Sequence, residues 1–462
     1  MGQGRGHRFL ILVVFLVAAM AVAFPLFKTP ILGIANNGDF GKVCLQFALS
    51  APQEEEYLYV SRIYRFDESK RWDSGFRSTE ALLVRVAQVV DDWLYVAGPD
   101  LDIRSMGIVH GVPFLVGLGL LVAFVTRVGG WRAWLLGGAG FFFLADFMYI
   151  SYWNSFSMDA VALSFGILSA GLTVWILLRP SWMLAILLTI SLCALVGSKT
   201  QHAVFLLPLA IWILSCGKNW WPRGGKWVRV MAALAVIASG VVSFRATSQG
   251  YAALSTYDIV FHRIVPWSAN QDAALTELGL DSSYRRYAGT HAFAPGAPTM
   301  DLDWVLAFEQ KVSSAKVAGY LLRHPVLTFR MLIDGLDAAG LQRAHNIGNF
   351  EKQAGFVGES LSSHFSFWNR AKTRIFKNHG LLYLSYFVLL AMALLWLLRN
   401  HAAAPAGWLL IVLAALAMGV GCLGDSVEVT RHLLLFDALL DGILWTVLVL
   451  ATKRSSVARM NQ

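Results

Sequence analysis

The chain has 462 residues, of which 56% are hydrophobic and only 15% are charged. Apolar segments of about 18 or more residues recur along it, which excludes a soluble globular domain and indicates a polytopic membrane protein. The net charge of +9 does not indicate a nucleic-acid partner. Most Lys and Arg residues lie in short loops between apolar segments, where the positive-inside rule accounts for them.

The first apolar run extends from Phe9 to Phe27 and follows Arg5 and Arg8. A cleaved signal peptide is the alternative, because Ala21-Val22-Ala23 resembles a cleavage site. The run is longer than the ~7–15 residues of a signal core. We therefore expect a retained first span with its N-terminus in the cytoplasm.

Residues 28–104 are expected to form a polar outer loop that begins with Asn36-Asn37-Gly38-Asp39-Phe40. Asn-Gly is a turn signal, and Asp39 precedes an amphipathic run from Phe40 to Leu49. Asp39 is thus either an acidic group held at the membrane surface or the N-cap of the following helix. This short stretch by itself does not decide between the two.

A second amphipathic helix is predicted from about Thr79 to Tyr95 in the same loop. Such a helix is expected to lie on the bilayer surface, not to span it. Its apolar positions repeat at helical spacing and are Leu82, Leu83, Val86, Val89, Val90 and Trp93.

Further apolar segments bring the total to about ten spans, each near the length that a bilayer requires. Basic residues in the short connections, such as Arg127, Arg132 and Arg179, all fall on one side. We expect an all-α fold with both termini in the cytoplasm. The further segments are 106–125, 134–147, 160–178, 182–197, 203–216, 228–244, 381–398, 408–423 and 433–451.

The region 245–379 between spans seven and eight is longer than an ordinary loop and is therefore expected to be functional. It shows few signals of an independent core, although a helix bent at Pro325 has an interfacial pattern. We expect three parts: a transmembrane module 1–244 with a catalytic outer loop 28–104, the outer region 245–379, and a second transmembrane module 380–462.

On this topology polar side chains from four separate loops share the outer face. Acids and bases concentrated at one membrane surface indicate a site for a charged, membrane-borne ligand. The residues are Asn37, Asp39, Asp146, Tyr152, Asn154, Asp159, Lys199, Gln201, His202, Glu428, Arg431 and His432.

Several of these residues also have a structural explanation. Asp159 opens a helix that runs inward and is a candidate N-cap, and Lys199 is a candidate to snorkel from the end of a span. Glu428 and Arg431 are three positions apart and are placed to pair with each other. Together with the N-cap alternative for Asp39, these explanations would require four separate coincidences on one face, and this favours a functional site.

Asp437 and Asp441 lie one turn apart inside the last span. Carboxylates in lipid are costly and are usually functional or paired, and Arg431 is the nearest candidate partner. Apart from His110 and these two residues the spans are apolar. Transporters need polar residues along a pathway, so a flippase is disfavoured.

The set of outer residues suits a polyprenyl-phosphate sugar donor. Lys199, Arg431 and His202 are expected to bind the donor phosphate and stabilise it as it leaves. A carboxylate would deprotonate the acceptor hydroxyl as it attacks the anomeric carbon, with inversion of configuration. The remaining carboxylates and amides would hold sugar hydroxyls.

The segments Asn36–Phe40 and Tyr152–Asp159 resemble bacterial membrane hexosyltransferases of surface-glycan synthesis, which belong to the GT-C superfamily. The likeness covers most of the chain by order of features, and no single motif is highly specific. Related proteins carry Tyr-x-Glu where this chain has Ser157-Met158-Asp159, which keeps the carboxylate but shortens it. Further similar stretches are 257–266, 275–280, 348–350 and 428–432.

The resemblance implies a GT-C fold, with Asp39 as general base in the first outer loop and a basic residue at the donor phosphate. The chain has no Asp-x-Asp or Walker-type loop for a nucleotide sugar, in agreement with a lipid-linked donor. Some members of the superfamily use a divalent metal and others use none. Asp39 and Asp159 would share such a metal only if the fold brings them together.

The sequence therefore predicts an inverting glycosyltransferase of the bacterial inner membrane. It would transfer a hexose from a polyprenyl phosphate to a glycan or lipid acceptor on the periplasmic side. A lipid-linked oligosaccharide flippase and an O-antigen-type polymerase are the alternatives. The polymerase would differ by using a polyprenyl diphosphate donor.

Overall fold

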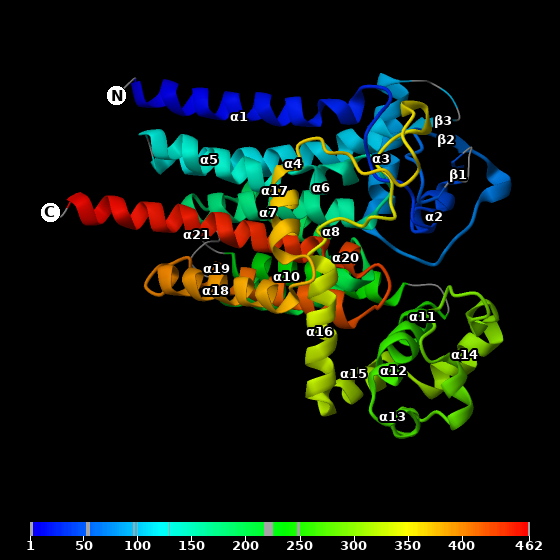
Figure 1. Ribbon diagram of the computed structural model, residues 1–462. Helices are drawn as coiled ribbons and strands as arrows, with labels where there is room; N and C mark the ends of the chain where they lie inside the picture. The colour runs from blue at the N-terminus through cyan, green and yellow to red at the C-terminus, as the bar shows by residue number, and fades with distance from the viewer. Residues whose placement is uncertain are drawn as a thin grey trace.

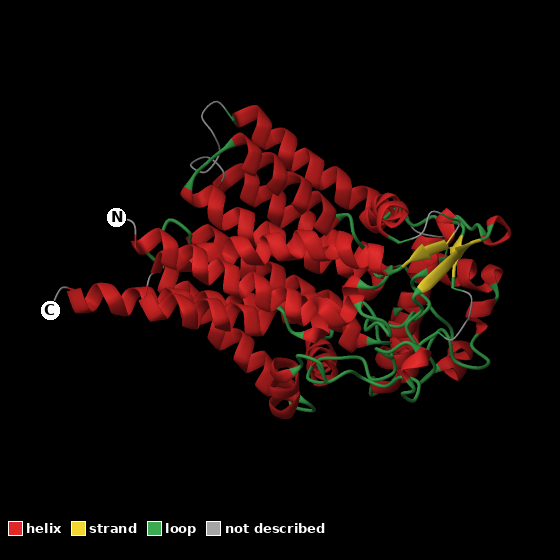
Figure 2. Cartoon of the chain, turned by 90° about the horizontal axis from the view of Figure 1, so that it is seen from above, coloured by secondary structure: helices red, strands yellow, loops and turns green. Residues whose placement is uncertain are grey.

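The computed structural model describes residues 3–51, 56–95, 98, 100–128, 130–216, 225–246 and 250–460. The protein is a bundle of long helices with both chain ends at the same end of the bundle (Figure 1). The strands and many of the loops and shorter helices gather at the opposite end, which we call the loop end (Figures 1 and 2).

Among the described residues, seven helices are long and apolar enough to cross a membrane. The predicted polytopic, mainly helical fold is thereby confirmed. The membrane-crossing part of each of the seven begins and ends within a few residues of a predicted span, because unbroken apolar runs define both. They are α1 (Gln3–Phe27), α4 (Arg104–Val125), α7 (Met158–Leu178), α10 (Lys226–Arg245), α18 (Gly380–Leu398), α19 (Ala404–Leu423) and α21 (Leu434–Met460).

The predicted third span is bent. Helix α5 (Gly130–Leu144) and the segment Phe147–Trp153, which begins with α6 (Phe147–Ile150), meet at 47° and count together as an eighth span. The fifth and sixth predicted spans correspond to α8 (Trp182–Val196) and to the apolar helix Thr200–Ser215, which includes most of α9 (Leu206–Cys216). These two helices are short, so the number of ten spans stays a prediction.

Small residues allow the central helices to approach closely. A Cβ atom added at Gly117 of α4 would lie 2.5 Å from the backbone nitrogen of Leu168 of α7. One added at Gly171 of α7 would lie 2.7 Å from the carbonyl oxygen of Gly117. Close backbone contact at small residues is how helices associate where the hydrophobic effect does not drive them together.

Residues 28–104, the predicted first outer loop, contain α2 (Gly41–Cys44), α3 (Thr79–Leu94) and a small antiparallel sheet in the order β1-β2-β3. Leu49 of β1 (Leu49–Ser50) is opposite Phe66 of β2 (Ile63–Phe66). Tyr64 of β2 is opposite Leu101 of β3 (Asp100–Asp102). The loop is therefore a folded cap on the end of the bundle.

Helix α3 confirms the predicted amphipathic helix and begins after Ser78, whose hydroxyl accepts a hydrogen bond from the Glu80 amide. Much of its apolar stripe faces outward, and Trp93 is 85% exposed. The face toward the protein carries Glu80, Val84, Ala87 and Asp91 instead. An apolar stripe turned away from the protein is what a helix on the bilayer surface requires.

The outer region contains a lobe of short helices with its own apolar cluster, built around Tyr257, Phe261 and Phe308. This core differs from the sequence-based expectation, because its aliphatic and aromatic residues lie on helices too short to show a clear period. The helices are α11 (Tyr251–Tyr257), the π-helix Asp258–Ile264, α12 (Val265–Trp267), α13 (Gln271–Glu277), α14 (Leu302–Lys311) and α15 (Ser314–Arg323).

Two helices after the lobe run across the bundle axis: α16 (Pro325–Ala339) and α17 (Phe367–Phe376) (Figure 1). The break between α15 and α16 at His324 agrees with the predicted bend at Pro325. Leu322 and Val326 beside the break are 83% and 84% exposed. The residues whose pattern predicted an interfacial helix therefore form an exposed apolar surface.

Candidate functional site

The guanidinium of Arg431 lies at the centre of a cluster of charged side chains at the loop end. Its Nη1 atom donates to the Asp39 carboxylate and lies 3.9 Å from Asp159 Oδ2. Its Nη2 atom is 2.9 Å from Glu428 Oε2. Three carboxylates from three separate parts of the chain thus meet at one cation.

Asp39 is positioned by the turn that precedes it. Asn36 Oδ1 accepts hydrogen bonds from the Gly38 and Phe40 amides at 2.9 and 3.1 Å. Gly38 has a φ of +86°, a conformation that glycine adopts at little cost. Helix α2 follows Phe40 and has no side-chain cap. The interpretation of Asp39 as an N-cap is therefore wrong, and its carboxylate pairs with Lys42 and Arg431.

Asp159 is left free to pair because Ser157 caps α7 in its place, accepting from the Asp159 amide at 3.3 Å. The Asp159 carboxylate accepts from Lys199 Nζ at 3.0 Å and lies 3.7 Å from His202 Nε2. Lys199 is only 6% exposed, so it does not snorkel to the surface. Both structural alternatives for this pair are wrong.

Glu428 stands directly before α20 (Val429–His432) and adopts a φ of +53°. A left-handed backbone is uncommon for a residue other than glycine and is concentrated at functional sites. Its carboxylate accepts from Asn37 Nδ2 at 2.9 Å as well as from Arg431. The predicted pair of Glu428 and Arg431 is confirmed, as part of the larger cluster.

A second layer of hydrogen bonds supports the charged cluster. Gln201 Oε1 is 3.0 Å from His432 Nδ1, and Gln201 Nε2 is 3.2 Å from His202 Nε2. The Ser198 hydroxyl is 2.7 Å from His202 Nδ1. These contacts join the segment after α8 to α20.

The electrostatics of the cluster favour an ionised Asp39. Burial by itself would raise the pKa of Asp39, but Arg431, Lys42 and Lys199 outweigh it and hold that pKa well below its usual range. Burial lowers the pKa of His432 well below its usual value, and Lys199 and Arg431 lower it further. The cluster thus combines ionised carboxylates, fixed cations and a neutral imidazole.

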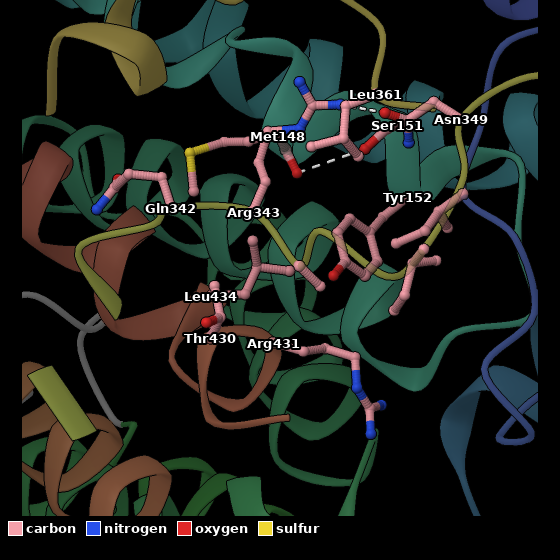
Figure 3. A pocket seen from close by; sticks show the side chains of 13 residues that line it. Met148, Ser151, Tyr152, Gln342, Arg343, Asn349, Leu361, Thr430, Arg431 and Leu434 are labelled. Atoms are coloured by element: carbon pink, nitrogen blue, oxygen red, sulfur yellow. Dashed lines mark hydrogen bonds between the residues drawn. The ribbon is translucent and has the colours of Figure 1, made fainter. Parts of the chain in front are cut away.

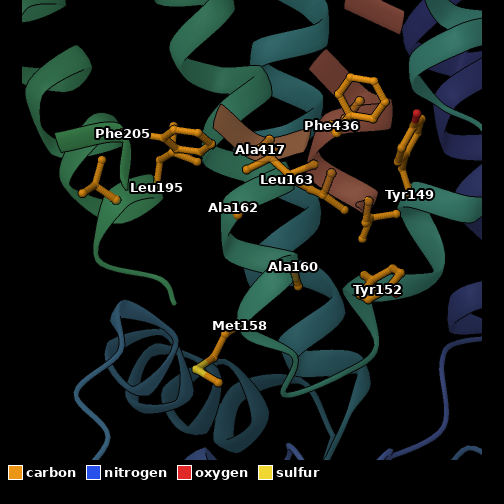
Figure 4. Packing of buried hydrophobic residues seen from close by; sticks show 14 of the residues in the cluster. Tyr149, Tyr152, Met158, Ala160, Ala162, Leu163, Leu195, Phe205, Ala417 and Phe436 are labelled. Atoms are coloured by element: carbon orange, nitrogen blue, oxygen red, sulfur yellow. The ribbon is translucent and has the colours of Figure 1, made fainter. Parts of the chain in front are cut away.

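An apolar layer lies beneath the cluster. Ala160 and Leu163 of α7 pack in one hydrophobic cluster with Tyr149, Phe205 and Phe436 from three other segments (Figure 4). Such packing excludes water from the inner side of the ionic groups. Charged hydrogen bonds at the cluster are stronger in that surrounding than in bulk water.

Asp146 and Asn154 lie outside the charged cluster, contrary to the sequence-based grouping. Asp146 accepts from the backbone of Met148 at 2.9 Å and from that of Asn369 at 3.0 Å. Asn154 Nδ2 donates to the carbonyl oxygens of Leu26 and Leu32. Buried polar groups need such partners, and these two residues fasten α17 and the end of α1 to the bundle.

Asp437 and Asp441 pair differently from the prediction. Asp441 Oδ2 accepts from Lys372 Nζ at 2.9 Å and from the Tyr149 hydroxyl at 2.6 Å, and Asp437 accepts from Tyr383. The expected partner, Arg431, is therefore wrong. Lys372 belongs to α17, whose insertion beside α21 no local pattern revealed (Figure 1).

Tyr152 lines a pocket beside the charged cluster, with an empty volume of about 340 Å³ including its open mouth (Figure 3). The stem of Arg431 forms part of its wall, and Arg343, which the sequence analysis missed, forms another part. Arg343 follows α16 and precedes the stretch 348–350 that carries the family resemblance. Its closeness to that stretch is the one feature of the sequence that could have indicated Arg343.

A divalent metal has no ready position in this cluster. Asp39 and Asp159 both belong to the cluster, but the cation that their carboxylates share is the Nη1 atom of Arg431. Within the described ranges no group of three or more His, Cys, Asp and Glu side chains is arranged to hold a metal ion.

The sequence was also compared with known proteins. A family model described as the YfdI N-terminal transmembrane domain matches residues 5–462. No curated protein matches the chain. The match spans nearly the whole chain, including every residue of the charged cluster.

Proposed function

The chain belongs to the YfdI family of transmembrane domains, and from that premise we propose that it is a membrane glycosyltransferase of the GT-C type. It would move a hexose from a polyprenyl-phosphate donor to a glycan or lipid acceptor outside the cytoplasm. The observation that carries this proposal is the meeting of Asp39, Asp159, Lys199 and Arg431 at the loop end of the bundle. Such a set supplies both a base and cations for a phosphate.

In the proposed reaction, the donor phosphate binds to Arg431 and Lys199. Both cations are held by carboxylates in the free protein, so the phosphate takes over part of the hydrogen bonding that Asp39 and Asp159 provide. Loss of its partner Arg431 makes Asp39 a stronger base, because Arg431 is the strongest of the charges that lower its pKa. Donor binding therefore prepares the base for the next step.

Asp39 then accepts the proton of the acceptor hydroxyl while the hydroxyl oxygen attacks the anomeric carbon of the sugar. The bond between that carbon and the phosphate oxygen breaks, and its electron pair stays on the departing polyprenyl phosphate. Arg431 and Lys199 stabilise the new negative charge. The configuration at the anomeric carbon is inverted.

Several polar partners of the cluster are suited to sugar hydroxyls. Asn37 and Glu428 carry amide and carboxylate oxygens beside Arg431, Gln201 contacts His432, and Tyr152 lines the neighbouring pocket. The exposed apolar stripe of α3 provides a surface for the polyprenyl chain. His202 is occupied by Ser198 and Asp159 and serves better to position Asp159 than to bind phosphate.

The proposal is tested by incubating purified protein with a panel of polyprenyl-phosphate sugars and an acceptor extract. Release of free polyprenyl phosphate with one member of the panel is the expected result. Turnover only with polyprenyl-diphosphate-linked glycans would identify a polymerase instead. Movement of lipid-linked sugar across vesicle membranes without any bond cleavage would identify a flippase.

A further inference from the structure

Arg343 differs from the cations of the charged cluster in its partners. Its Nη1 atom donates to the carbonyl oxygen of Ser362 at 2.7 Å, and its Nη2 atom donates to Asn349 Oδ1. Both acceptors are neutral. In the part of the chain that the structure describes, no carboxylate lies within ion-pairing distance of Arg343. The charge of this partly buried guanidinium is therefore uncompensated.

The cations of the charged cluster are all compensated. Lys42 pairs with Asp39, Lys199 pairs with Asp159, and Arg431 pairs with Asp39 and Glu428. A cation removed from water needs an anion or several hydrogen bonds to offset the cost of desolvation. Burial lowers the pKa of Arg343 to about 10, and the nearby Asp146 offsets this only in part. Arg343 is thus a partly buried cation beside the cluster whose hydrogen-bond partners are neutral.

Two residues that line the pocket beside Arg343 carry buried polar atoms without a partner. Arg431 Nε and Gln342 Oε1 are buried and have no hydrogen-bond partner. Both residues line the pocket, and each side chain is more than nine-tenths buried. A buried polar group without a partner costs about 1–3 kcal/mol, so such atoms are rare in native proteins.

The rest of the pocket wall is mostly apolar. Figure 3 shows Met148, Leu434 and Tyr152 around the space that Arg343 and Arg431 also line. An anion in that space is partly shielded from water, which strengthens its hydrogen bonds to an arginine of the pocket wall. Arginine also offers two parallel N–H groups that match the oxygens of a phosphate.

We propose that this pocket is an anion-binding subsite that takes a phosphate group of a lipid-linked substrate, with Arg343 as its principal cation. The lipid-linked nature of the substrate rests on the proposed function. The anion binding rests on the pocket itself. The phosphate has two sources: the donor, or an acceptor that is itself carried on a phosphorylated lipid. In the first case Arg343 acts on the leaving group together with Arg431, and in the second it selects the acceptor.

The test measures binding and does not depend on turnover. Purified protein in nanodiscs of neutral lipid is titrated with polyprenyl monophosphate, with a polyprenyl-diphosphate-linked sugar and with uncharged polyprenol. The variants are Arg343→Gln and Arg343→Lys. Arg370→Gln serves as the matched control, because Arg370 is an exposed arginine near Arg343 whose guanidinium contacts the Ser366 carbonyl and the Phe367 ring.

For at least one phosphorylated lipid we expect Arg343→Gln to weaken binding by about 10- to 100-fold, the range of a lost charged hydrogen bond. Arg343→Lys should recover part of that loss, while Arg370→Gln and polyprenol binding should show no change. A loss confined to the monophosphate assigns the donor as the source. A loss confined to the diphosphate-linked sugar assigns the acceptor.

Equal binding of both phosphorylated lipids by wild type and Arg343→Gln would overturn the proposal. If the glutamine variant does not fold, as judged by size-exclusion chromatography, unchanged binding by the uncharged variant Arg343→Met at both lipids has the same meaning. The proposed function can fail without the subsite. If Arg343→Gln loses lipid binding although no member of the sugar panel is turned over, the subsite is supported and the proposed function is not.

Discussion

Arg431 donates a hydrogen bond to the carboxylate of Asp39, a residue 392 positions earlier in the chain. The same guanidinium contacts Glu428 and approaches Asp159. Because the candidate base is paired with a candidate phosphate-binding group, its pKa stays low in the free protein. Binding of an anionic substrate at Arg431 would weaken this pair and make Asp39 a stronger base.

Replacing Asp39 by Asn should abolish sugar transfer while the protein remains folded. The amide keeps the size of the side chain and accepts a hydrogen bond from Arg431, but it does not take a proton. Loss of a general base lowers the rate by about 10²–10⁴-fold. Release of polyprenyl phosphate by purified protein measures the effect. Asp73→Asn, an exposed residue paired with Arg77 in the same outer loop, is the control, and full activity of Asp39→Asn would remove Asp39 from the reaction.

Replacing Lys199 or Arg431 by Ala should weaken donor binding. Each removes a charged hydrogen bond to the phosphate, which corresponds to about 10- to 100-fold in affinity. Titration of each variant with a non-transferable polyprenyl-phosphate sugar measures the change, with the thermal unfolding temperature as a check on folding. Donor affinity equal to that of wild type in both variants would place the phosphate elsewhere.

Replacing Lys372 by Met should destabilise the protein strongly, because Asp441 then stays as a buried charge without its cation. Breaking a buried pair from one side costs about 3–5 kcal/mol. Adding Asp441→Asn should restore most of the loss, since the amide carries no charge: its one oxygen accepts from Trp368, and its NH2 group can donate to the Tyr149 hydroxyl oxygen. Thermal unfolding in detergent measures both effects. The matched control, Arg77→Met, breaks an exposed pair and should cost no more than about 1 kcal/mol.

The stability of the outer lobe should fall as the pH rises from about 4 to about 7. Burial raises the pKa of Asp258 to about 7, with a further contribution from Asp425. In the unfolded chain an Asp ionises near pH ~3.9. Across this interval the folded protein therefore binds the proton that the unfolded chain has lost, and the free energy of unfolding decreases with pH.

Asp258→Asn should flatten this dependence, because the amide does not titrate and its oxygen still accepts from the Ala292 amide. The unfolding temperature of the purified protein between pH 4 and 8 measures the slope. An Asp272→Asn control at an exposed site of the same lobe should leave the slope as in wild type. A slope that is the same for Asp258→Asn and wild type would contradict this assignment.

The sequence determined the membrane class and the positions of the main helices. Apolar runs and their ends depend on neighbouring residues only, so α1, α4, α7, α18, α19 and α21 follow directly from them. The same holds for the amphipathic character of α3 and for the turn at Asn36–Gly38. The four outer segments that carry the charged cluster were found in this way.

Only the tertiary structure decided which polar residues meet. Asp39 and Asp159 reach Arg431, and Lys199 reaches Asp159, whereas Asp146 and Asn154 turn to backbone groups of α17 and α1. Lys372 reaches Asp441 because α17 packs beside α21, and Arg343 reaches the pocket because α16 ends there. These contacts join segments far apart in sequence. Their partners depend on how the helices pack, and helical periodicity carries no information about that.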